Sequence, residues 1–532
     1  MPIEIRALIF IFLIVAIPMF IFMRFADHFS LKNETKKWVL IWVVTTALAF
    51  LSHNFWLFLA FMSLILLTYT KNNPTLKVSL FFVLLPSIPS GHAIIPGFGI
   101  VNYFISINFQ MFLSAILMLP LAISKSNSNR AIKSSEFLIY CFFLLSAVTH
   151  FQESSFIRQG VLITRESSIT EVLRYSVILT LQMLVPYLAI SRTIRTSQQL
   201  QTVLFAMLFG IFLQASLAIA ETLKYWRLYN SVGDTLGLIS GSANYLQREN
   251  LLRASGAFEH PITLGAITTI GIGLLLHFSV RKKPRIKRYF WIIMAIIGAG
   301  LIATLSRGPW VGAAALVLTY LLLSNQSIKK ISKLAVIGVF SLLVASMTPM
   351  GDRIVGLIPY INSDEASHSV STITYRERLF EQSLKVIVQN PIFGSVNYLR
   401  TPEMEEMRQG EGIIDMVNEY LAIALEYGLF GLSIYLGIFM FIMIKIYKAI
   451  SYLKRNNKEE TLLSQGKVIF VIMCGFLVTA ATTGISVMAQ YFLWSLTGLA
   501  VAYINVFQSE LLNMYRERNE VATSQPPIKS IP

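Results

Sequence analysis

Apolar residues along this chain gather into blocks of about 17–25 residues, the length that a helix needs to cross a hydrocarbon core about 30 Å thick. Fifteen such blocks can be marked, at residues 7–23, 37–52, 54–70, 78–95, 103–123, 135–151, 170–190, 200–220, 257–280, 289–305, 309–324, 334–350, 416–444, 468–484 and 490–508. A segment in lipid must pair its own backbone groups, and the blocks lack the alternation of barrel strands. We therefore predict an all-α, polytopic transmembrane helix bundle of 12 to 15 spans. The first block lacks a convincing cleavage site, so we expect it to be retained as a span.

The composition agrees with a membrane protein and excludes a soluble globular enzyme. Of the 532 residues, 55% are hydrophobic and only 14% are charged, against roughly 25% charged residues in soluble domains. The net charge of +16 could suggest nucleic acid, but the basic residues lie in short loops between apolar blocks. We therefore expect no nucleic-acid partner. Cys141 and Cys474 lie inside predicted spans and provide neither a disulfide framework nor a metal-ligand spacing.

Lysine and arginine divide the loops into two sets. One set of alternate loops, together with the C-terminal tail, holds 29 of the 44 basic residues and includes the runs Arg281–Arg288 and Lys445–Lys467. We predict that this set is cytoplasmic and that the chain crosses the bacterial inner membrane several times. The other set faces the periplasm or exterior and contains two long segments, Glu221–Gly256 and Gly351–Asp415. Loops of this length in a compact protein are usually functional.

The chain is expected to have four regions and no separate soluble domain or internal repeat. Residues 1–250 are N-terminal transmembrane helices, 251–445 form a core that includes the periplasmic loop 351–415, and 446–508 are C-terminal transmembrane helices. Residues 509–532 form a polar cytoplasmic tail, for which the composition predicts disorder.

Arginines on the predicted outer side stand close to apolar blocks. Arg253 precedes a span, Arg307 lies in a tight Ser-Arg-Gly-Pro break between two spans, and Arg376 and Arg378 lie in the largest loop. A guanidinium stays charged and offers a planar fork of donors that matches phosphate. Each arginine taken singly could pair with lipid phosphate or with a loop carboxylate. Together they suggest a pyrophosphate site at the outer boundary of the membrane.

Acidic residues end the large loop and lead directly into a span. Glu411, Asp415, Asn418 and Glu419 are spaced to share one face of a helix. Ionisable groups at the membrane edge are costly, and a carboxylate here could be the general base for a sugar hydroxyl. The alternative is a solvated helix start, where acidic residues favour the helix dipole. His260 is a further candidate base, or could only cap the next helix.

Several motifs that would indicate other chemistry are missing. The sequence has no P-loop, no G-x-G-x-x-G before a strand, no H-E-x-x-H, no paired C-x-x-C and no D-x-D pair for a sugar-nucleotide metal. We therefore expect no metal and no cofactor. If the protein does chemistry, the energy should come from a preactivated donor in the membrane.

Four short blocks between about residues 250 and 435 resemble the O-antigen ligase and polymerase superfamily. In the order of that family they are R-x-x-G-x-F-x-H-P from Arg253 to Pro261, S-R-G at 306–308, Arg376 about fifteen residues before N-P-x-x-G at 390–394, and N-x-Y-L-x-x-x-L-E-x-G-x-x-G from Asn418 to Gly431. The first 250 residues match only as generic spans.

This resemblance implies a membrane glycosyltransferase that transfers or polymerises an undecaprenyl-diphosphate-linked glycan on the periplasmic face, without metal or nucleotide. The acceptor would be a glycan or a lipid, and the other partners are membrane lipids. The family arginines would hold the diphosphate, a role that falls here on Arg253, Arg307 and Arg376, with Arg378 and Asn418 as further candidates. Such donors commonly stabilise developing charge by about 3–4 kcal/mol each.

One position departs from the family pattern. Many ligases carry a histidine immediately before the asparagine of the fourth block, where this chain has Val417. Either Asp415, Glu411 or Glu419 then acts as the base, with His260 as the fallback, or the acceptor is different.

Other function classes stay open at the level of the sequence. The chain could be a polysaccharide flippase or other transporter, or a non-catalytic membrane partner of an envelope complex. Within the enzyme class, ligase, polymerase and protein-directed oligosaccharyltransferase are not separated. The nearly uncharged middles of the spans argue against a transporter, which needs polar residues at mid-membrane depth.

Overall fold

The structure, a computed structural model, describes residues 2–524 apart from 99–102, 125–132, 150–153, 159–160, 166–168, 240–245, 249, 259, 280–283, 325–367, 410–411, 413 and 457–458. The predicted span at 334–350 and the candidate base Glu411 lie outside these residues.

Long apolar helices dominate the described chain. Eight are long and apolar enough to cross a membrane: α1 (Ile3–Asp27), the continuous helix α8–η2–α9 (Ile169–Thr193), α10 (Ser197–Lys224), α12 (Pro261–Phe278), α13 (Pro284–Ala303), α19 (Glu419–Arg455), α20 (Glu460–Thr482) and α21 (Val487–Ser524). Five shorter apolar helices accompany them: α3 (Phe55–Tyr69), α4 (Pro74–Leu84), α5–η1–α6 (Phe109–Ile123), α7 (Lys133–Thr149) and α14 (Arg307–Leu322). Helix α2 (Lys32–Leu51) adds a further apolar segment behind a charged first turn. The predicted all-α, polytopic membrane protein is confirmed.

Two of these helices contain a π-helical turn. Turn η1 (Ser114–Met118) joins α5 (Phe109–Leu113) to α6 (Leu119–Ile123), and η2 (Thr180–Leu184) joins α8 (Ile169–Leu179) to α9 (Val185–Thr193). Each turn is followed within two residues by a proline, Pro120 or Pro186. Proline lacks the N–H that a regular α-helix needs, so an irregular turn at these positions has a local cause.

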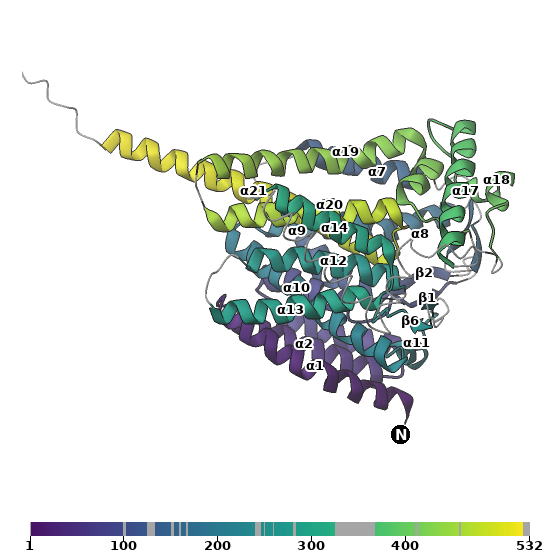
Figure 1. Cartoon of the computed structure of the whole chain (residues 1–532), viewed down its shortest axis with the longest axis horizontal. Helices are drawn as coiled ribbons and strands as arrows, with labels where there is room; N and C mark the ends of the chain where they lie inside the picture. Colours follow the sequence, from purple (N-terminus) through teal and green to yellow (C-terminus); the bar gives the residue numbers. More distant parts are fainter. Residues whose placement is uncertain are drawn as a thin grey trace, which may run out of the picture.

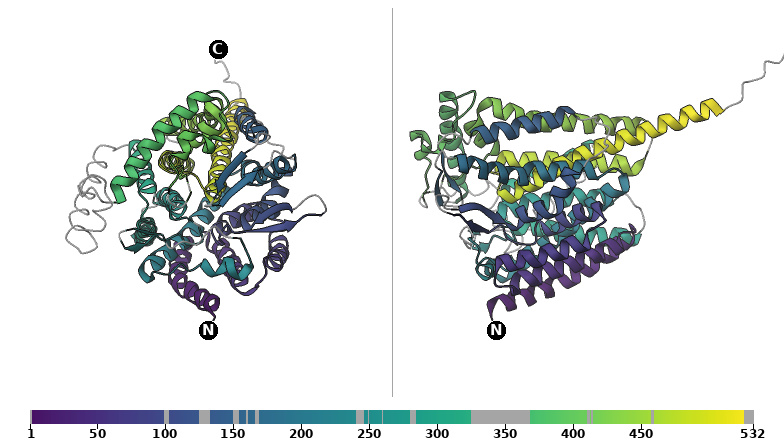
Figure 2. Two further views of the ribbon diagram at one scale, coloured as in Figure 1. Left: turned by 90° about the vertical axis from the view of Figure 1, so that its right-hand side faces the viewer. Right: turned by 180° about the vertical axis from the view of Figure 1, so that it is seen from behind.

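Short elements collect at one end of the bundle, which we call the hairpin end (Figure 1). They include three antiparallel hairpins: β1 (His92–Pro96) with β2 (Tyr103–Asn108), β3 (Ser154–Arg158) with β4 (Val161–Arg165), and β5 (Gln247–Arg248) with β6 (Leu251–Leu252). The helices at this end are the longer α17 (His368–Gln389) and the short α11 (Asn230–Leu236), η3 (Tyr398–Arg400) and α18 (Pro402–Glu405). The N-terminus lies at the hairpin end, whereas α21 extends beyond the opposite end (Figure 2).

Described helix ends next to two of the predicted basic loops lie at the end opposite the hairpins. Helix α12 begins and α13 ends beside the same segment, because the N–H of Ala254 donates to the carbonyl of Ala303. Helices α19 and α20 are likewise joined at the hairpin end by a bond between Glu419 and Ile485. The end of α12, the start of α13, the end of α19 and the start of α20 must therefore lie at the far end, and with them the described basic residues Lys287, Arg288, Lys445, Lys454 and Lys467.

Helix α10 forms the centre of the bundle. It packs against α1, α4, α12 and α13, and nearly all of its span is buried within the protein. Aromatic rings fill the contact with the N-terminal helices, where Phe205 and Phe209 meet Phe22 and Trp38. A central helix of this kind can bring polar residues near its end into a protein-lined site.

Two segments differ from the predictions made from hydropathy. The blocks at 78–95 and 103–123 were expected to be spans, but α4 stops at Leu84 and residues 92–108 form the β1–β2 hairpin. Pro86, Pro89 and Pro96 remove helix donors, and Tyr103–Asn108 is rich in aromatic and β-branched residues, which favour strands. The tail predicted to be disordered after Ser509 continues α21 as far as Ser524. This segment is rich in good helix formers and ends just before Pro526 and Pro527.

Candidate functional site

The first two sequence blocks meet at the turn between α13 and α14. Arg253 donates from Nε to the carbonyl of Thr304 at 3.3 Å and from Nη2 to Oγ of Ser306 at 2.9 Å. Leu305 between these two residues has a positive φ of 47°, so its turn is strained. Arg248 donates to the carbonyl of Leu305 at 3.0 Å. Arg307 follows as the first residue of α14, so three arginines surround one turn.

The glycine of the S-R-G block has a packing role. A Cβ on Gly308 would meet the side chains of Thr483 and Thr482 at 2.6 and 2.8 Å. Helix α14 therefore approaches the end of α20 more closely than a larger residue would allow. This contact fixes the depth at which Arg307 begins its helix.

Two polar side chains of α10 hold the segment that follows Arg253. Glu221 is fully buried, and its carboxylate accepts from the backbone N–H groups of Leu228, Ser255 and Gly256 at 2.8–3.1 Å. Gln214, two turns earlier on α10, accepts from the N–H of Ala257 at 3.0 Å. Buried backbone donors without such acceptors would be costly. We call this pair of residues, Gln214 and Glu221, the α10 clamp.

The α10 clamp requires a glycine at position 256, in the first sequence block. Its φ of 56° is left-handed, and a Cβ there would meet Oε1 of Gln214 at 2.6 Å. Only glycine takes this conformation without strain while leaving space for the clamp. Arg227 completes the arrangement by donating to Oγ of Ser255 at 2.6 Å.

Tyr375, the residue before Arg376 of the third block, holds the backbone of Asp415. The hydroxyl of Tyr375 on α17 donates to the carbonyl of Asp415 at 3.2 Å and accepts from the N–H of Asp415 at 3.0 Å. One tyrosine thus fixes the backbone of Asp415 from both sides. Because Arg376 follows Tyr375 in the chain, the same anchor sets the distance between Arg376 and Asp415.

Charges of opposite sign act on one another across the site without direct pairing. The surrounding protein raises the pKa of Asp415, while Arg376 and Arg253 act to lower it. Burial lowers the pKa of Arg253 to about 10 and also lowers that of Arg376, and Asp415 opposes both effects. Within the part of the chain that the structure describes, neither arginine forms an ion pair with Asp415, and the buried Nε of Arg376 has no hydrogen-bond partner. Asp415 itself keeps access to solvent. An anion could therefore enter between these charges.

His260 lies near Arg253 and Arg227. It precedes α12, and its Nδ1 accepts from the N–H of Ile262 at 3.3 Å, so it caps the helix. The surrounding protein, followed by the positive charges of Arg253 and Arg227, lowers the pKa of His260 to about 4 although the side chain retains contact with solvent. The ring is therefore neutral at pH 7. With Nδ1 accepting, its proton is on Nε2, which suits a hydrogen-bond donor better than a base.

Asn418 and Glu419 have structural partners at the start of α19. Oδ1 of Asn418 accepts from the N–H groups of Tyr420 and Leu421 at 3.0 and 3.3 Å and caps the helix. Glu419 accepts from the N–H of Ile485 at 2.8 Å and so holds the α20–α21 connection. Glu411, Asp415, Asn418 and Glu419 form the acidic pattern of the sequence. Of these residues, Asp415 is the described carboxylate whose pKa Arg253 and Arg376 affect.

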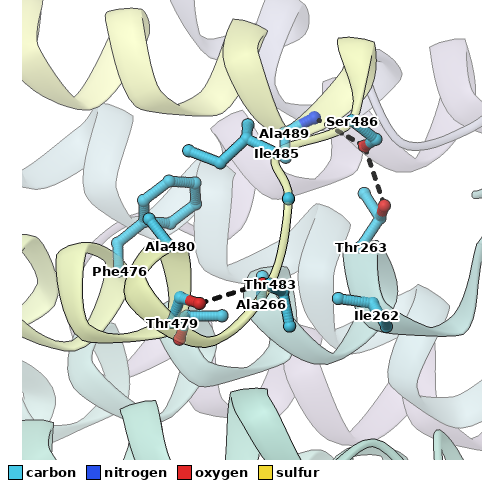
Figure 3. Close-up of a pocket in the computed structure, with 11 residues that line it drawn as sticks. Ile262, Thr263, Ala266, Phe476, Thr479, Ala480, Thr483, Ile485, Ser486 and Ala489 are labelled. Carbon is cyan, nitrogen blue, oxygen red and sulfur yellow. Dashed lines mark hydrogen bonds between the residues drawn. The ribbon is translucent and has the colours of Figure 1, made fainter. Parts of the chain in front are cut away.

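A small hollow lies beside this connection (Figure 3). Hydroxyl groups of Thr263, Thr479, Thr483 and Ser486 line it together with methyl and ring carbons, and Thr263 and Ser486 are bonded at 2.8 Å. The Thr263–Ser486 bond ties the start of α12 to the start of α21. No charged side chain lines the hollow. Its contribution to the site is the Thr263–Ser486 hydrogen bond, which fixes the two helix starts.

The third and fourth blocks dock on each other through glycines. The N–H groups of Leu429 and Phe430 donate to the carbonyls of Pro391 and Ile392 at 2.8 and 3.1 Å. Gly428 has a φ of 68° inside α19, where the helix kinks, and a Cβ on it would collide with the carbonyl of Ile392. The N-P-x-x-G and E-x-G-x-x-G patterns are therefore two halves of one contact. It secures α17, and with it Arg376, against a membrane span.

The structure brings together Arg253, Arg376, Asp415 and His260 from the sequence candidates. Arg378 is exposed on α17. Sequence reasoning missed five residues: Gln214, Glu221, Arg227, Arg248 and Tyr375. Glu221 opens the long segment 221–256 that the sequence marked as functional, and Tyr375 adjoins Arg376, so both had a weak signal. Gln214 lies in a continuous apolar block and had none.

A known protein family matches part of the chain. Residues 292–436 match the family described as O-antigen ligase. This segment contains Arg307, Arg376 and Asp415 and ends after the fourth block, whereas Arg253 and His260 precede it. No curated protein matches the chain. The resemblance read from the four sequence blocks is thereby confirmed over the second, third and fourth of them.

Proposed function

We propose that this O-antigen ligase-like membrane protein transfers a glycan from a membrane-bound diphosphate donor to a hydroxyl acceptor at the hairpin end of the bundle. One observation carries the proposal: Arg253 and Arg376 act on Asp415 from different elements, yet neither pairs with it directly. Two guanidinium groups with an uncommitted carboxylate nearby suit an anionic leaving group and a nucleophile that must lose a proton.

The donor that fits this chemistry is an undecaprenyl-diphosphate-linked glycan. Its lipid would remain in the membrane while its diphosphate lies against the arginines at the membrane boundary. Arg307 stands at the first turn of α14, where backbone N–H groups add to its charge. The acceptor is a glycan or a lipid, and both ligation and polymerisation use the same bond change.

The reaction has one bond exchange and one proton transfer. The acceptor oxygen attacks the anomeric carbon of the donor sugar and forms the new glycosidic bond. The bond between that carbon and the diphosphate oxygen breaks, and the diphosphate leaves with the electron pair. Asp415 takes the proton of the acceptor hydroxyl. Arg253, Arg376 and Arg307 stabilise the charge on the leaving diphosphate.

His260 and the remaining candidates take supporting roles in this proposal. Neutral His260 can donate from Nε2 to a phosphate or sugar oxygen near Arg253. Asn418 and Glu419 hold the start of α19, and the α10 clamp holds the segment after Arg253. Residues 251–445 would then contain every group that contacts the substrates, in agreement with the expected core region.

The proposal is tested by reconstituting the full chain in vesicles with undecaprenyl-diphosphate-linked glycan and a hydroxyl acceptor, and measuring release of undecaprenyl diphosphate. We expect transfer to persist in excess EDTA, because every group assigned above belongs to the chain. Arg376→Ala should reduce the rate by about 100- to 1,000-fold, as for loss of one well-placed donor. Arg400→Ala, an exposed arginine at the same end, is the matched control and should keep its activity. Equal rates for both variants would disprove the assignment of the diphosphate site.

Ligation and polymerisation are separated in cells. Surface polysaccharide from a strain that lacks the gene is analysed on gels. Loss of all attached glycan indicates a ligase, whereas survival of one attached repeat indicates a polymerase. An unchanged pattern with accumulation of glycan on the inner side of the membrane would instead support a flippase.

A further inference from the structure

Helix α17 carries exposed apolar side chains that the proposed chemistry does not use. Phe380, Leu384 and Val388 recur every four residues, and Val388 is 76% exposed. They form one flank of the helix, between a buried face that includes Leu379 and a charged face that includes Lys385. A helix with one face on protein, one apolar flank and one charged face matches a membrane interface, where protein, lipid and water meet.

The turn after α17 continues this apolar flank. Ile392 and Phe393 are more than half exposed. The backbone bonds from Leu429 and Phe430 seat the turn on the kink of α19, and the rings of Phe393 and Phe430 lie 5.8 Å apart. The depth of this turn relative to the membrane is therefore set by α19.

Helix α19 shows where lipid lies. Its exposed apolar residues follow one another from the kink toward the far end: Leu429, Phe430, Leu436, Met440, Ile444 and Tyr447. Because α19 is a membrane span, this stripe is its lipid-facing side. Leu429 and Phe430 form the end of the stripe nearest the hairpin end, and Phe393 lies next to Phe430.

We propose that the flank of α17 and the turn at 391–394 are inserted in the leaflet at the hairpin end, so that lipid acyl chains cover Phe380, Leu384, Val388, Ile392 and Phe393. The course of α17 across the ends of the spans, rather than along them, suits this placement (Figure 1). Exposed charged residues of both signs border this flank, Glu377 and Glu381 as well as Arg378 and Lys385. The basic pair would reach lipid phosphates, and the acidic pair would stay in the water above the headgroups. The large loop is then partly a membrane-surface element and not wholly an aqueous one.

This surface has a consequence for the site. Arg376 lies one turn before Phe380 on the same helix. Insertion of the flank would therefore keep that guanidinium at headgroup level, where a lipid-linked phosphate is found. The proposal itself does not depend on transferase chemistry, since it concerns only what covers the flank.

The test places a fluorescent label at single cysteines in the full chain, reconstituted in lipid vesicles. The background is Cys141→Ser with Cys474→Ser, and the labelled variants are Val388→Cys and Phe393→Cys. Lys385→Cys, on the charged face of the same helix, is the matched control. Brominated lipids quench labels in the bilayer, and iodide quenches labels in water. A third variant, Leu384→Cys, replaces either apolar position if that variant does not accumulate.

Labels at positions 388 and 393 should be quenched several-fold more by brominated lipid than the label at 385, and should be shielded from iodide. Iodide quenching equal to that at 385 would place the flank in water and overturn the proposal. Shielding from both quenchers would also overturn it, because a second copy of the chain or another protein would then cover the flank.

Discussion

Tyr375 links the two halves of the candidate site through a single hydroxyl. It binds the backbone N–H and carbonyl of Asp415, and its neighbour Arg376 has a buried Nε without a partner among the described residues. At the scale of single residues, the positive charges of Arg253 and Arg376 are therefore not paired with Asp415 and can bind an anion. A carboxylate in direct salt bridges would be a weaker base, because an adjacent positive charge stabilises its ionised form.

The pH dependence of transfer should report Asp415. Its pKa is raised above the ordinary value of 3.8, and only the ionised form accepts a proton. Activity should therefore be complete above this raised pKa and fall about tenfold per pH unit below it. Because the pKa of His260 is about 4, that ring stays neutral and should add no change between pH 5 and 8. The measurement is the rate of transfer against pH under limiting donor.

Asp415→Asn should lower the rate by about 100- to 10,000-fold and remove the acidic limb of this profile. Glu405→Gln is the control, since Glu405 pairs with Arg408 on an exposed surface. If Asp415→Asn keeps the acidic limb, another group takes the proton, and Glu411 becomes the first candidate to test.

At the scale of elements, the position of Arg253 depends on α10. The α10 clamp reaches from a buried transmembrane helix to the backbone of residues 255–257, two positions after Arg253. Glu221 accepts the N–H groups of residues 255 and 256, and Gln214 accepts that of residue 257. The position of Arg253 is therefore determined by a helix about thirty residues away in sequence, through contacts that carry no substrate.

Glu221→Gln should disturb Arg253 without removing any substrate contact. The amide replaces one acceptor oxygen with a donor that faces backbone N–H groups, at a cost of about 1–3 kcal/mol. We expect a modest loss of thermal stability and a larger loss of donor affinity, with acceptor affinity unchanged. Asp234→Asn, an exposed carboxylate of α11, serves as the control. A uniform loss of both affinities would indicate a general folding defect instead of a displaced arginine.

At the scale of the whole molecule, charge and chemistry are separated between the two ends of the bundle. Hairpins and α17 lie at one end of the bundle (Figures 1 and 2). The described basic residues at the start of α13 and the end of α19 lie at the other. By the positive-inside rule, we propose that the basic end faces the cytoplasm and the hairpin end faces the periplasm.

Labelling of cysteines from outside the cell tests this orientation. In the background without Cys141 and Cys474, an impermeant maleimide should modify Lys385→Cys on α17. It should not modify Lys454→Cys at the far end of α19 until the membrane is opened. Both positions are exposed in the folded chain, so access and not burial decides the result. The opposite pattern would place the site in the cytoplasm and exclude a periplasmic transfer reaction.

The sequence by itself determined the membrane class, the helical architecture, the unequal share of basic residues in the two sets of loops and the four blocks around the site. These follow from local physics: apolar length sets a span, loop charge sets its sidedness, and glycine, proline and arginine mark breaks and anion contacts. The tertiary structure decided which of the candidates meet. It joined Arg253 to Ser306, placed Asp415 under Tyr375 and gave Asn418 and Glu419 structural partners. It also revealed Gln214 and Glu221, which hydropathy cannot distinguish from polar interruptions in a span. Hydrogen bonds between residues far apart in sequence depend on how helices pack, and packing is not encoded in any short pattern of the chain.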